Sequence, residues 1–150
     1  MDDILPRTDD RDTAGFWKAA LEERLVVQEC DDCGHLRFPP HPYCPKCRCA
    51  THSWHQVSGY GRIWTYAIAH KPTASAFAAR TPYPIGYIAL EDHPSIRMTG
   101  NFVTGPEAEI DSVPHDQIKI GARVKVLFRK MAEDVALPLW TPTPEERLEV

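Results

Sequence analysis

The sequence predicts a mainly β protein, and three features of its 150 residues carry this prediction. Four of its five cysteines form two C-x2-C pairs separated by ten residues, which is the spacing of a zinc-binding hairpin. A short segment before them has apolar residues at helical spacing. After them, residues 58–140 read as strands punctuated by Gly and Pro. We therefore expect an N-terminal helix, a rubredoxin-like zinc ribbon and a five-stranded OB-fold barrel.

Composition and charge restrict the class of protein. A hydrophobic content of 43% and a charged content of 25% are typical of a soluble globular protein. The acidic start is unlike a secretory signal, and no run approaches the ~18 apolar residues of a membrane helix, so we expect the cytoplasm. The first 12 residues contain five Asp and two Arg, and the last ten contain three Glu and one Arg. Because these two ends carry net charges of −3 and −2 out of a total of −4, the body of the chain, residues 13–140, carries +1. Such a body lacks the basic field that nucleic-acid backbones select.

Changes in composition and in hydrophobic pattern divide the chain into four segments. We expect an acidic flexible leader over 1–12, the helix and zinc ribbon over 13–57, the OB-fold over 58–140 and a flexible acidic tail over 141–150. Within the third segment, the connector at 71–84 lacks periodicity and holds three prolines. Loops of this length in compact domains are often functional.

The helix is expected to start near Asp12 or Thr13, because either side chain can cap the first free N–H groups, and to run through FWKAALEERL. One face of it is apolar and consists of Phe16, Trp17, Ala20 and Leu21. Such a face buries against the rest of the chain or against a partner, and the sequence does not choose between them. Two large aromatics at a helix start fit an interface well.

The two cysteine pairs offer four thiolates at the corners of a tetrahedron, and the expected ligands are Cys30, Cys33, Cys44 and Cys47. A Zn²⁺ ion that is held by four cysteines has no open coordination position, so it cannot activate water or polarise a carbonyl. The expected metal is therefore structural. Disulfides are disfavoured because nothing in the chain indicates an oxidising compartment.

The turns after the two pairs differ in sequence. Gly34 follows the first pair and tolerates the left-handed conformation that a tight turn needs. Arg48 stands at the equivalent place in the second pair, where a glycine would be easier. Cys49 therefore remains an alternative to Cys47 as the fourth ligand, and otherwise it is an inert buried thiol.

Alternating apolar and polar residues predict the strands. The expected strands flanking the ribbon are 25–29 and 53–57, and those of the barrel are 62–70, 85–91, 95–103 and 123–130, to which 137–140 can add an edge strand. Two of these alternate cleanly, and their expected inward residues are Ile96, Met98, Gly100 and Phe102, then Val124, Val126 and Phe128. The proline-rich segment at 38–42 is expected to form a stiff tip of the ribbon hairpin.

These elements, in this order, resemble a known family. The residues that carry the resemblance are Phe16-Trp17, Cys30-Asp31-Asp32-Cys33-Gly34, Pro39-Pro40, Cys44-Pro45-Lys46-Cys47, Trp54, Ser58-Gly59-Tyr60-Gly61 and Gly121-Ala122-Arg123-Val124-Lys125-Val126-Leu127-Phe128. They extend over about residues 13–140. The ordered combination resembles the zinc-ribbon plus OB-fold proteins that accompany acyl-CoA enzymes.

The resemblance implies a non-catalytic accessory subunit. Members of this family are found with thiolase-like subunits, including thiolases of acyl-CoA degradation and thiolase-like aldolases that shorten steroid side chains, and they help to bind or channel the CoA ester. The resemblance thus implies a hetero-oligomer with a thiolase-like catalytic subunit, an acyl-CoA from aromatic, fatty acid or steroid (lipid) degradation and a structural Zn²⁺, and it carries over no catalytic residue. On this reading Phe16 and Trp17 form the expected partner interface.

Cationic side chains near the ribbon and the barrel mouth are candidates for contacts with CoA phosphates. They are Arg37, Lys46, Arg48 and Arg62. We expect some of them to form charge-assisted hydrogen bonds with the diphosphate or the ribose phosphate, although each can equally be a solvated surface residue. All five cysteines lie in or beside the expected zinc site, and the seven histidines are scattered along the sequence. No cysteine is therefore expected to serve as a nucleophile with a helper base, and the chain alone makes a poor enzyme.

Two other functions fit the same elements. OB-fold barrels often bind single-stranded nucleic acid, and Trp64, Tyr66 and Tyr87 could supply base stacking, although the charge of the body argues against this function. A stand-alone acyl-CoA thioesterase is the second alternative. Turnover of an acyl-CoA by the purified chain would establish it.

Overall fold

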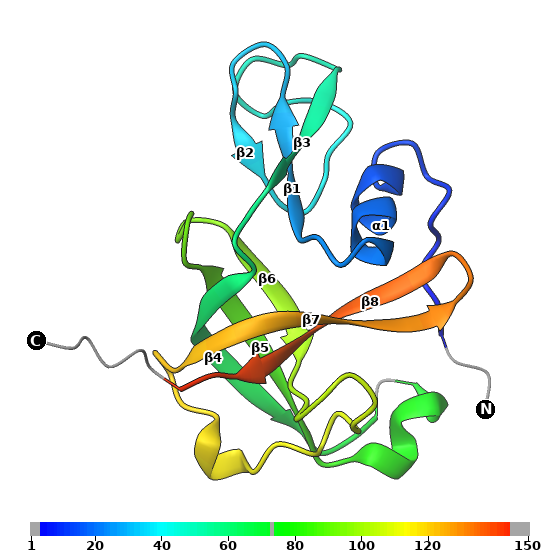
Figure 1. Ribbon diagram of the computed structural model, residues 1–150, viewed down its shortest axis with the longest axis vertical. Coiled ribbons are helices and arrows are strands. Elements are labelled where there is room, and N and C mark those ends of the chain that lie inside the picture. Colours follow the sequence, from blue (N-terminus) through cyan, green and yellow to red (C-terminus); the bar gives the residue numbers. More distant parts are fainter. Residues whose placement is uncertain (1–3, 73, 145–150) are drawn as a thin grey trace, which may run out of the picture.

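Figure 1 presents the computed structural model of the protein, which describes residues 4–72 and 74–144. A small sheet forms the ribbon at one end of the molecule and a larger sheet forms the barrel at the other. The ribbon sheet has the order β2-β1-β3 with antiparallel neighbours. Its strands are β1 (Val26–Cys30), β2 (Leu36–Arg37) and β3 (His52–Gln56).

The barrel sheet has five antiparallel strands in the order β6-β5-β4-β7-β8. A parallel bridge between Phe102, just after β6, and Trp140 on β8 brings the two outer strands together, and the Val103 N–H donates to the Trp140 carbonyl at 2.9 Å. This closure gives the partly open five-stranded barrel that the sequence predicted. The strands are β4 (Tyr60–Ala69), β5 (Tyr83–Leu90), β6 (Arg97–Asn101), β7 (Arg123–Ala132) and β8 (Val135–Pro142).

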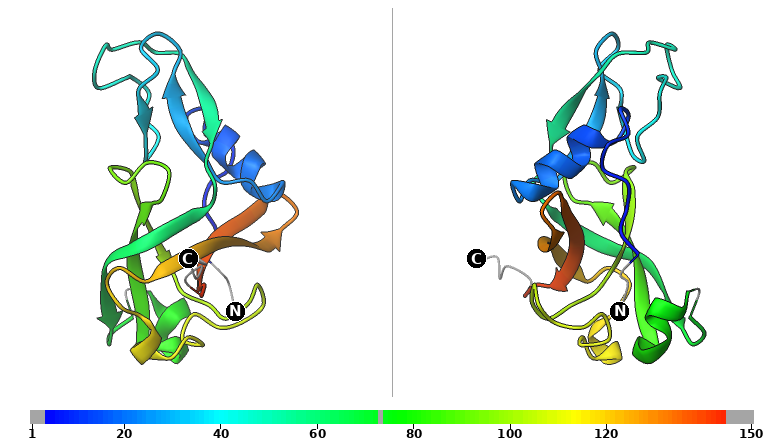
Figure 2. Two further views of the ribbon diagram at one scale, coloured as in Figure 1. Left: turned by 60° about the vertical axis from the view of Figure 1, so that its left-hand side comes forward. Right: turned by 90° about the vertical axis from the view of Figure 1, so that its right-hand side faces the viewer.

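Helix α1 (Ala14–Leu21) lies between the ribbon and the β7–β8 hairpin (Figures 1 and 2). Thr13 precedes it but makes no side-chain capping bond, so the expected side-chain cap is wrong; the N–H groups of Thr13 and Ala14 instead donate to the Asp10 carbonyl. The helix also ends four residues earlier than expected. Glu23 adopts a left-handed φ of 57°, and the N–H groups of residues 23 and 24 close a Schellman turn on the carbonyls of residues 20 and 19.

One hydrophobic core joins all three parts of the molecule. Phe16 from α1, Val27 from β1 and Ile63, Ile88 and Trp140 from the barrel belong to the same buried cluster. A smaller cluster fills the other end of the barrel and includes Tyr83, Val103, Ile110 and Leu139. The ribbon is therefore packed onto the barrel and does not depend on the metal alone for its position.

The strand predictions hold for most of the barrel, with three differences. A bulge between Ile63 and Thr65 breaks the alternation of β4, and residues 64–67 are exposed. The connector at 71–84 contains a short 3-10 helix, Ser75–Arg80, and β5 begins at Tyr83. β8 continues to Pro142, beyond the expected edge strand, and residues 145–150 of the expected tail lie outside the described residues.

The inward residues of the two cleanly alternating stretches are placed as expected. Met98, Phe102, Val124 and Val126 are buried, and Phe128 is half-buried at the edge of the core. Between β6 and β7, residues Ile110, Val113 and Ile118 supply buried apolar groups. Over residues 4–72 and 74–144, no helix has the length and apolar character needed to cross a membrane.

Candidate functional site

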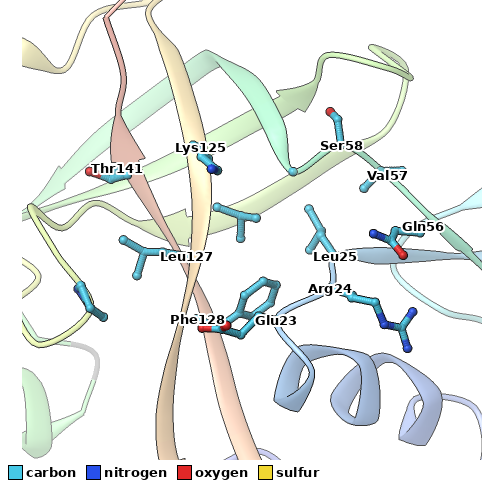
Figure 3. A pocket seen from close by; sticks show the side chains of 13 residues that line it. Glu23, Arg24, Leu25, Gln56, Val57, Ser58, Lys125, Leu127, Phe128 and Thr141 are labelled. Atoms are coloured by element: carbon cyan, nitrogen blue, oxygen red, sulfur yellow. The ribbon is translucent and has the colours of Figure 1, made fainter.

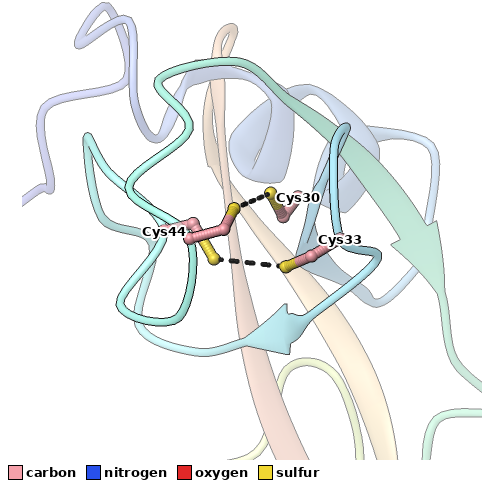
Figure 4. A group of neighbouring side chains, drawn as sticks. Cys30, Cys33 and Cys44 are labelled. Carbon is pink, nitrogen blue, oxygen red and sulfur yellow. Dashed lines mark hydrogen bonds between the residues drawn. The ribbon is translucent and has the colours of Figure 1, made fainter.

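The four predicted cysteine ligands converge at the end of the ribbon that points away from the barrel (Figures 1 and 4). All four sulfur atoms lie within 4.8 Å of one another. The Sγ atoms of Cys30 and Cys47 are 3.5 Å apart, and those of Cys33 and Cys44 are 3.6 Å apart. These distances exceed the ~2.05 Å of a disulfide, and they approach the roughly 3.8 Å between sulfurs of a tetrahedral site with Zn–S bonds of ~2.3 Å. The donor set therefore fits a structural Zn²⁺.

The two halves of the site are built in the same way. After the first pair, the Gly34 N–H donates to the Cys30 carbonyl at 3.0 Å; after the second, the Arg48 N–H donates to the Cys44 carbonyl at 2.9 Å. Both turn residues are left-handed, with φ of 71° at Gly34 and 64° at Arg48. The prediction that Arg48 occupies a position suited to glycine is confirmed, and the left-handed arginine costs about 1 kcal/mol or more in backbone strain.

The position of Cys49 decides between the two candidates for the fourth ligand. Its carbonyl accepts from the Cys44 N–H at 2.9 Å, as the His35 carbonyl accepts from the Cys30 N–H. Cys49 thus follows the second turn as His35 follows the first, and its sulfur lies 3.3 Å from Thr51 Oγ1. Cys47 completes the site, and Cys49 is a half-buried thiol beside it.

Backbone amides, burial and neighbouring sulfurs together shift the pKa values of the thiols. Hydrogen bonds from the backbone of Cys33, then of Asp32, help to lower the pKa of Cys30 to about 6 against the effect of burial. The backbone of Cys49 lowers the pKa of Cys47, but burial and hydrogen bonds with three neighbouring thiols outweigh it and raise that pKa to about 12. The crowding of sulfurs thus favours a shared cation, because four thiolates cannot lie together uncompensated.

A second feature, which the sequence did not predict, is a pocket of about 390 Å³ at the junction of ribbon and barrel (Figure 3). Leu25, Val57 and Val126 line it with buried apolar side chains. Arg24, which is ion-paired with Glu22, and the exposed Lys125 line it with cationic groups, and Glu23 adds a carboxylate. The pocket can take a ligand with an apolar part and an anionic part.

The pocket could not be predicted from the sequence because segments far apart in the chain form it: the turn after α1, the connection from β3 to β4, and β7, with Pro106 and Thr141 from two further segments. The connection between ribbon and barrel is fixed at this point. The carboxylate of Asp92 accepts from both the N–H group and the hydroxyl of Ser58, with the N–H at 2.8 Å. The hydroxyl contributes most to lowering the pKa of Asp92.

The four cations that were predicted to meet CoA phosphates do not form one site. Arg37 is 5% exposed, and its Nη2 donates to the His41 carbonyl at 3.4 Å, so an external phosphate cannot reach it in this conformation. Lys46 and Arg48 are exposed on the second cysteine turn. Arg62 lies on the barrel, where it donates to the Gly121 carbonyl at 3.0 Å and lies 4.0 Å from Glu91.

The two aromatics predicted at a partner interface are placed differently. Phe16 is 6% exposed and packs inside the chain's own core, with its ring 5.6 Å from that of Phe38. Trp17 is half-buried at the edge of this core and meets Phe16 edge-to-face at 5.1 Å. Trp17 is therefore the one of the pair that retains surface for a partner.

Comparison with known proteins places both parts of the chain in one family. Residues 17–52 match the rubredoxin-like zinc ribbon domain of ChsH2, and residues 54–129 match the C-terminal OB-fold domain of ChsH2. A DUF35 domain-containing scaffold protein from Methanocaldococcus jannaschii is 35% identical over 117 residues, which cover 76% of this chain and 75% of that protein. A probable enoyl-CoA hydratase alpha subunit from Thermomonospora curvata is 32% identical over 139 residues, or 91% of this chain. The chain spans only 39% of the length of that hydratase subunit.

A solved structure described as an Ltp2-ChsH2(DUF35) aldolase has the same fold. The TM-score is 0.73 at 30% sequence identity, and the match covers 91% of this chain and 98% of that chain. A DUF35-family protein of unknown function from Sulfolobus solfataricus, with 13% identity and a TM-score of 0.58, shares the fold alone.

Proposed function

The chain belongs to the ChsH2 family of zinc-ribbon and OB-fold proteins, and we propose that it is a non-catalytic accessory subunit that binds or channels an acyl-CoA for a thiolase-like partner. The partner is a thiolase or an aldolase that cleaves side chains by a retro-aldol reaction, in aromatic, fatty acid or steroid degradation in the cytoplasm. The observation that carries this proposal is the match, over 91% of the chain, to a structure described as an aldolase that contains a ChsH2(DUF35) component.

The junction pocket supports the acyl-CoA part of the proposal. Its buried apolar lining suits a pantetheine arm or an acyl chain, and the exposed Lys125 offers charge to an anionic group. The pocket walls come from the ribbon side and from the barrel. A ligand held there would contact both parts of the subunit.

The arrangement of nucleophiles supports a non-catalytic role. Four cysteines are metal ligands and the sulfur of Cys49 lies against Thr51, so none is paired with a base. Ser58 donates its hydroxyl to Asp92, whose lowered pKa makes it a weak base. These contacts speak against the stand-alone thioesterase.

Co-expression with a thiolase-like subunit from the same genome tests the proposal. We expect the two to co-elute and the activity of the partner on its acyl-CoA to depend on this chain. Trp17→Ala should keep its zinc and weaken co-elution, whereas Lys18→Ala on the exposed side of the same helix should keep its zinc and leave co-elution unchanged. If the subunits never co-elute and the activity is the same without this chain, the accessory role is wrong.

A further inference from the structure

A belt of cationic and aromatic side chains crosses the outer face of the barrel sheet. Strand register places Arg123, Arg62, Ala89 and Arg97 side by side on β7, β4, β5 and β6. Residues directly opposite each other in antiparallel strands point to the same face of a sheet. This face is the outer one, because the alternate residues Gly61, Val124 and Met98 are buried.

Trp64 forms one end of this belt. Its side chain is 50% exposed and stands at the bulge in β4. The guanidinium of Arg97 lies 4.1 Å from the centre of its ring, and Tyr87 meets the ring at 5.8 Å nearly edge-on. The Nε atom of Arg97 is buried and has no hydrogen-bond partner among the described residues. An exposed indole beside a polarising cation and a second aromatic ring is a stacking platform.

Lys125 forms the other end and joins the belt to the junction pocket. Its ammonium lies 5.4 Å from the centre of the Tyr60 ring, which Arg123 covers at 4.0 Å. Lys125 also lines the pocket. The belt thus runs from the pocket on β7, across β4 and β5, to Arg97 on β6, a span of roughly 14 Å at ~4.8 Å per strand, and Trp64 reaches this end from β4 by stacking against Arg97.

The charge of the belt favours an anion. Among the residues that the structure describes, it holds four cations, Lys125, Arg123, Arg62 and Arg97, and one carboxylate, Glu91, which accepts from Arg123 at 3.0 and 3.1 Å. The body as a whole is nearly neutral, so this concentration arises only when the sheet brings distant strands together. Cations beside an aromatic platform match a base that carries phosphates.

We propose that the Trp64 end of the belt binds a nucleotide, with the base stacked on Trp64 and the phosphates beside Arg97. Resting on the proposed function, the nucleotide is the phosphorylated adenosine of an acyl-CoA whose pantetheine arm runs along the belt to the junction pocket. Single-stranded nucleic acid offers the same chemistry. The free nucleotide is favoured because the cations form one row across the strands of a nearly neutral body rather than an extended basic groove.

Isothermal titration calorimetry of the zinc-loaded full chain with adenosine 3′,5′-bisphosphate, CoA and pantetheine tests the assignment. Wild type should bind the first two in a salt-sensitive manner. Trp64→Ala should weaken binding of the bisphosphate roughly 5- to 150-fold, the range expected for loss of one base stack. Arg97→Ala should weaken it and reduce the salt dependence. Tyr66→Ala is the matched control: this side chain is 39% exposed on the same strand and lies outside the belt.

Several results would overturn the assignment. Wild type could fail to bind the bisphosphate, or the Trp64 and Arg97 variants could bind as well as the Tyr66 control. Tighter binding of a short single-stranded oligonucleotide than of CoA would replace the free nucleotide by nucleic acid. Zinc content and far-UV circular dichroism check folding, and if Trp64→Ala fails to fold, Trp64→Phe and Arg97→Ala still decide. Unchanged nucleotide binding in these variants, with an intact partner complex, would refute the belt assignment and leave the accessory role standing.

Discussion

Gly15 of helix α1 lies against the Trp54 side chain of the ribbon, and Gly15→Ala tests how the two are packed. A methyl group at this position would overlap Nε1 of the Trp54 ring and would lie 2.5 Å from Cε2 and 2.6 Å from Cδ1 of this ring, which packs against the core. Alanine is better than glycine inside a helix by about 1 kcal/mol, whereas overpacking costs about 1–3 kcal/mol. The cost of overpacking should exceed the gain in helix propensity, so we expect a net destabilisation of about 1 kcal/mol.

Removing the Trp54 ring should turn the effect of Gly15→Ala on stability from destabilising to stabilising. In a Trp54→Ala background the new methyl group has room, and Gly15→Ala should stabilise the protein by about 1 kcal/mol. The coupling between the two changes then equals the cost of overpacking, about 1–3 kcal/mol. Lys18→Gly, on the exposed side of the helix, measures how much a glycine destabilises helix α1 where no ring is in contact with it.

Urea unfolding of the zinc-saturated variants, followed by far-UV circular dichroism, gives these free energies. The core shared by helix, ribbon and barrel supports a single cooperative transition. Equal effects of Gly15→Ala in the wild-type and Trp54→Ala backgrounds would refute the reasoning, because they would mean that α1 does not press on Trp54.

Two further predictions concern the ribbon and its connection to the barrel. Cys33→Ser should lose zinc and unfold the ribbon because a thiolate ligand is gone, whereas Cys49→Ser should keep one zinc per chain; atomic absorption measures both, and equal loss would contradict the ligand assignment. The hydrogen bonds from Ser58 lower the folded-state pKa of Asp92, so their stabilisation is present above the unfolded-state pKa and is lost as the pH falls through the folded value. Asp92→Asn should therefore cost about 1 kcal/mol at neutral pH, a value reduced for solvent exposure, and nothing in strong acid. Urea unfolding across pH checks this, and a cost that persists in strong acid would rule out the charge as its cause.

The zinc site could be predicted because all of its determinants are local. The two pairs and their turns lie within 20 residues, and the left-handed turns at Gly34 and Arg48 follow from the pattern of each pair. The alternation of β7 was equally readable, since Val124 and Val126 face the core of their own sheet. Periodicity and ligand spacing act over a few residues, which is the range that sequence reasoning covers.

The pocket and the belt could not be predicted because they depend on which strands become neighbours. Arg62 and Arg123 are far apart in the sequence and lie opposite each other only because β4 pairs with β7. For Arg37, by contrast, the sequence suggested a role that the structure does not support. A cation in a polar ribbon suggests an exposed side chain, but β2 lies under the proline-rich tip, where Arg37 is buried and reaches the carbonyl of His41.

The core shared by the ribbon and the barrel has a consequence for the energetics of assembly. The metal site lies at the end of the ribbon farthest from the barrel (Figure 1), while Phe16 and Val27 fix the base of the ribbon in the common core. Two parts joined by a flexible linker would lose their relative freedom when a partner immobilises both, and that loss weakens binding. An arm that is already fixed at its base has little such freedom to lose. A partner that holds the cysteine end would therefore orient the barrel at little further entropic cost.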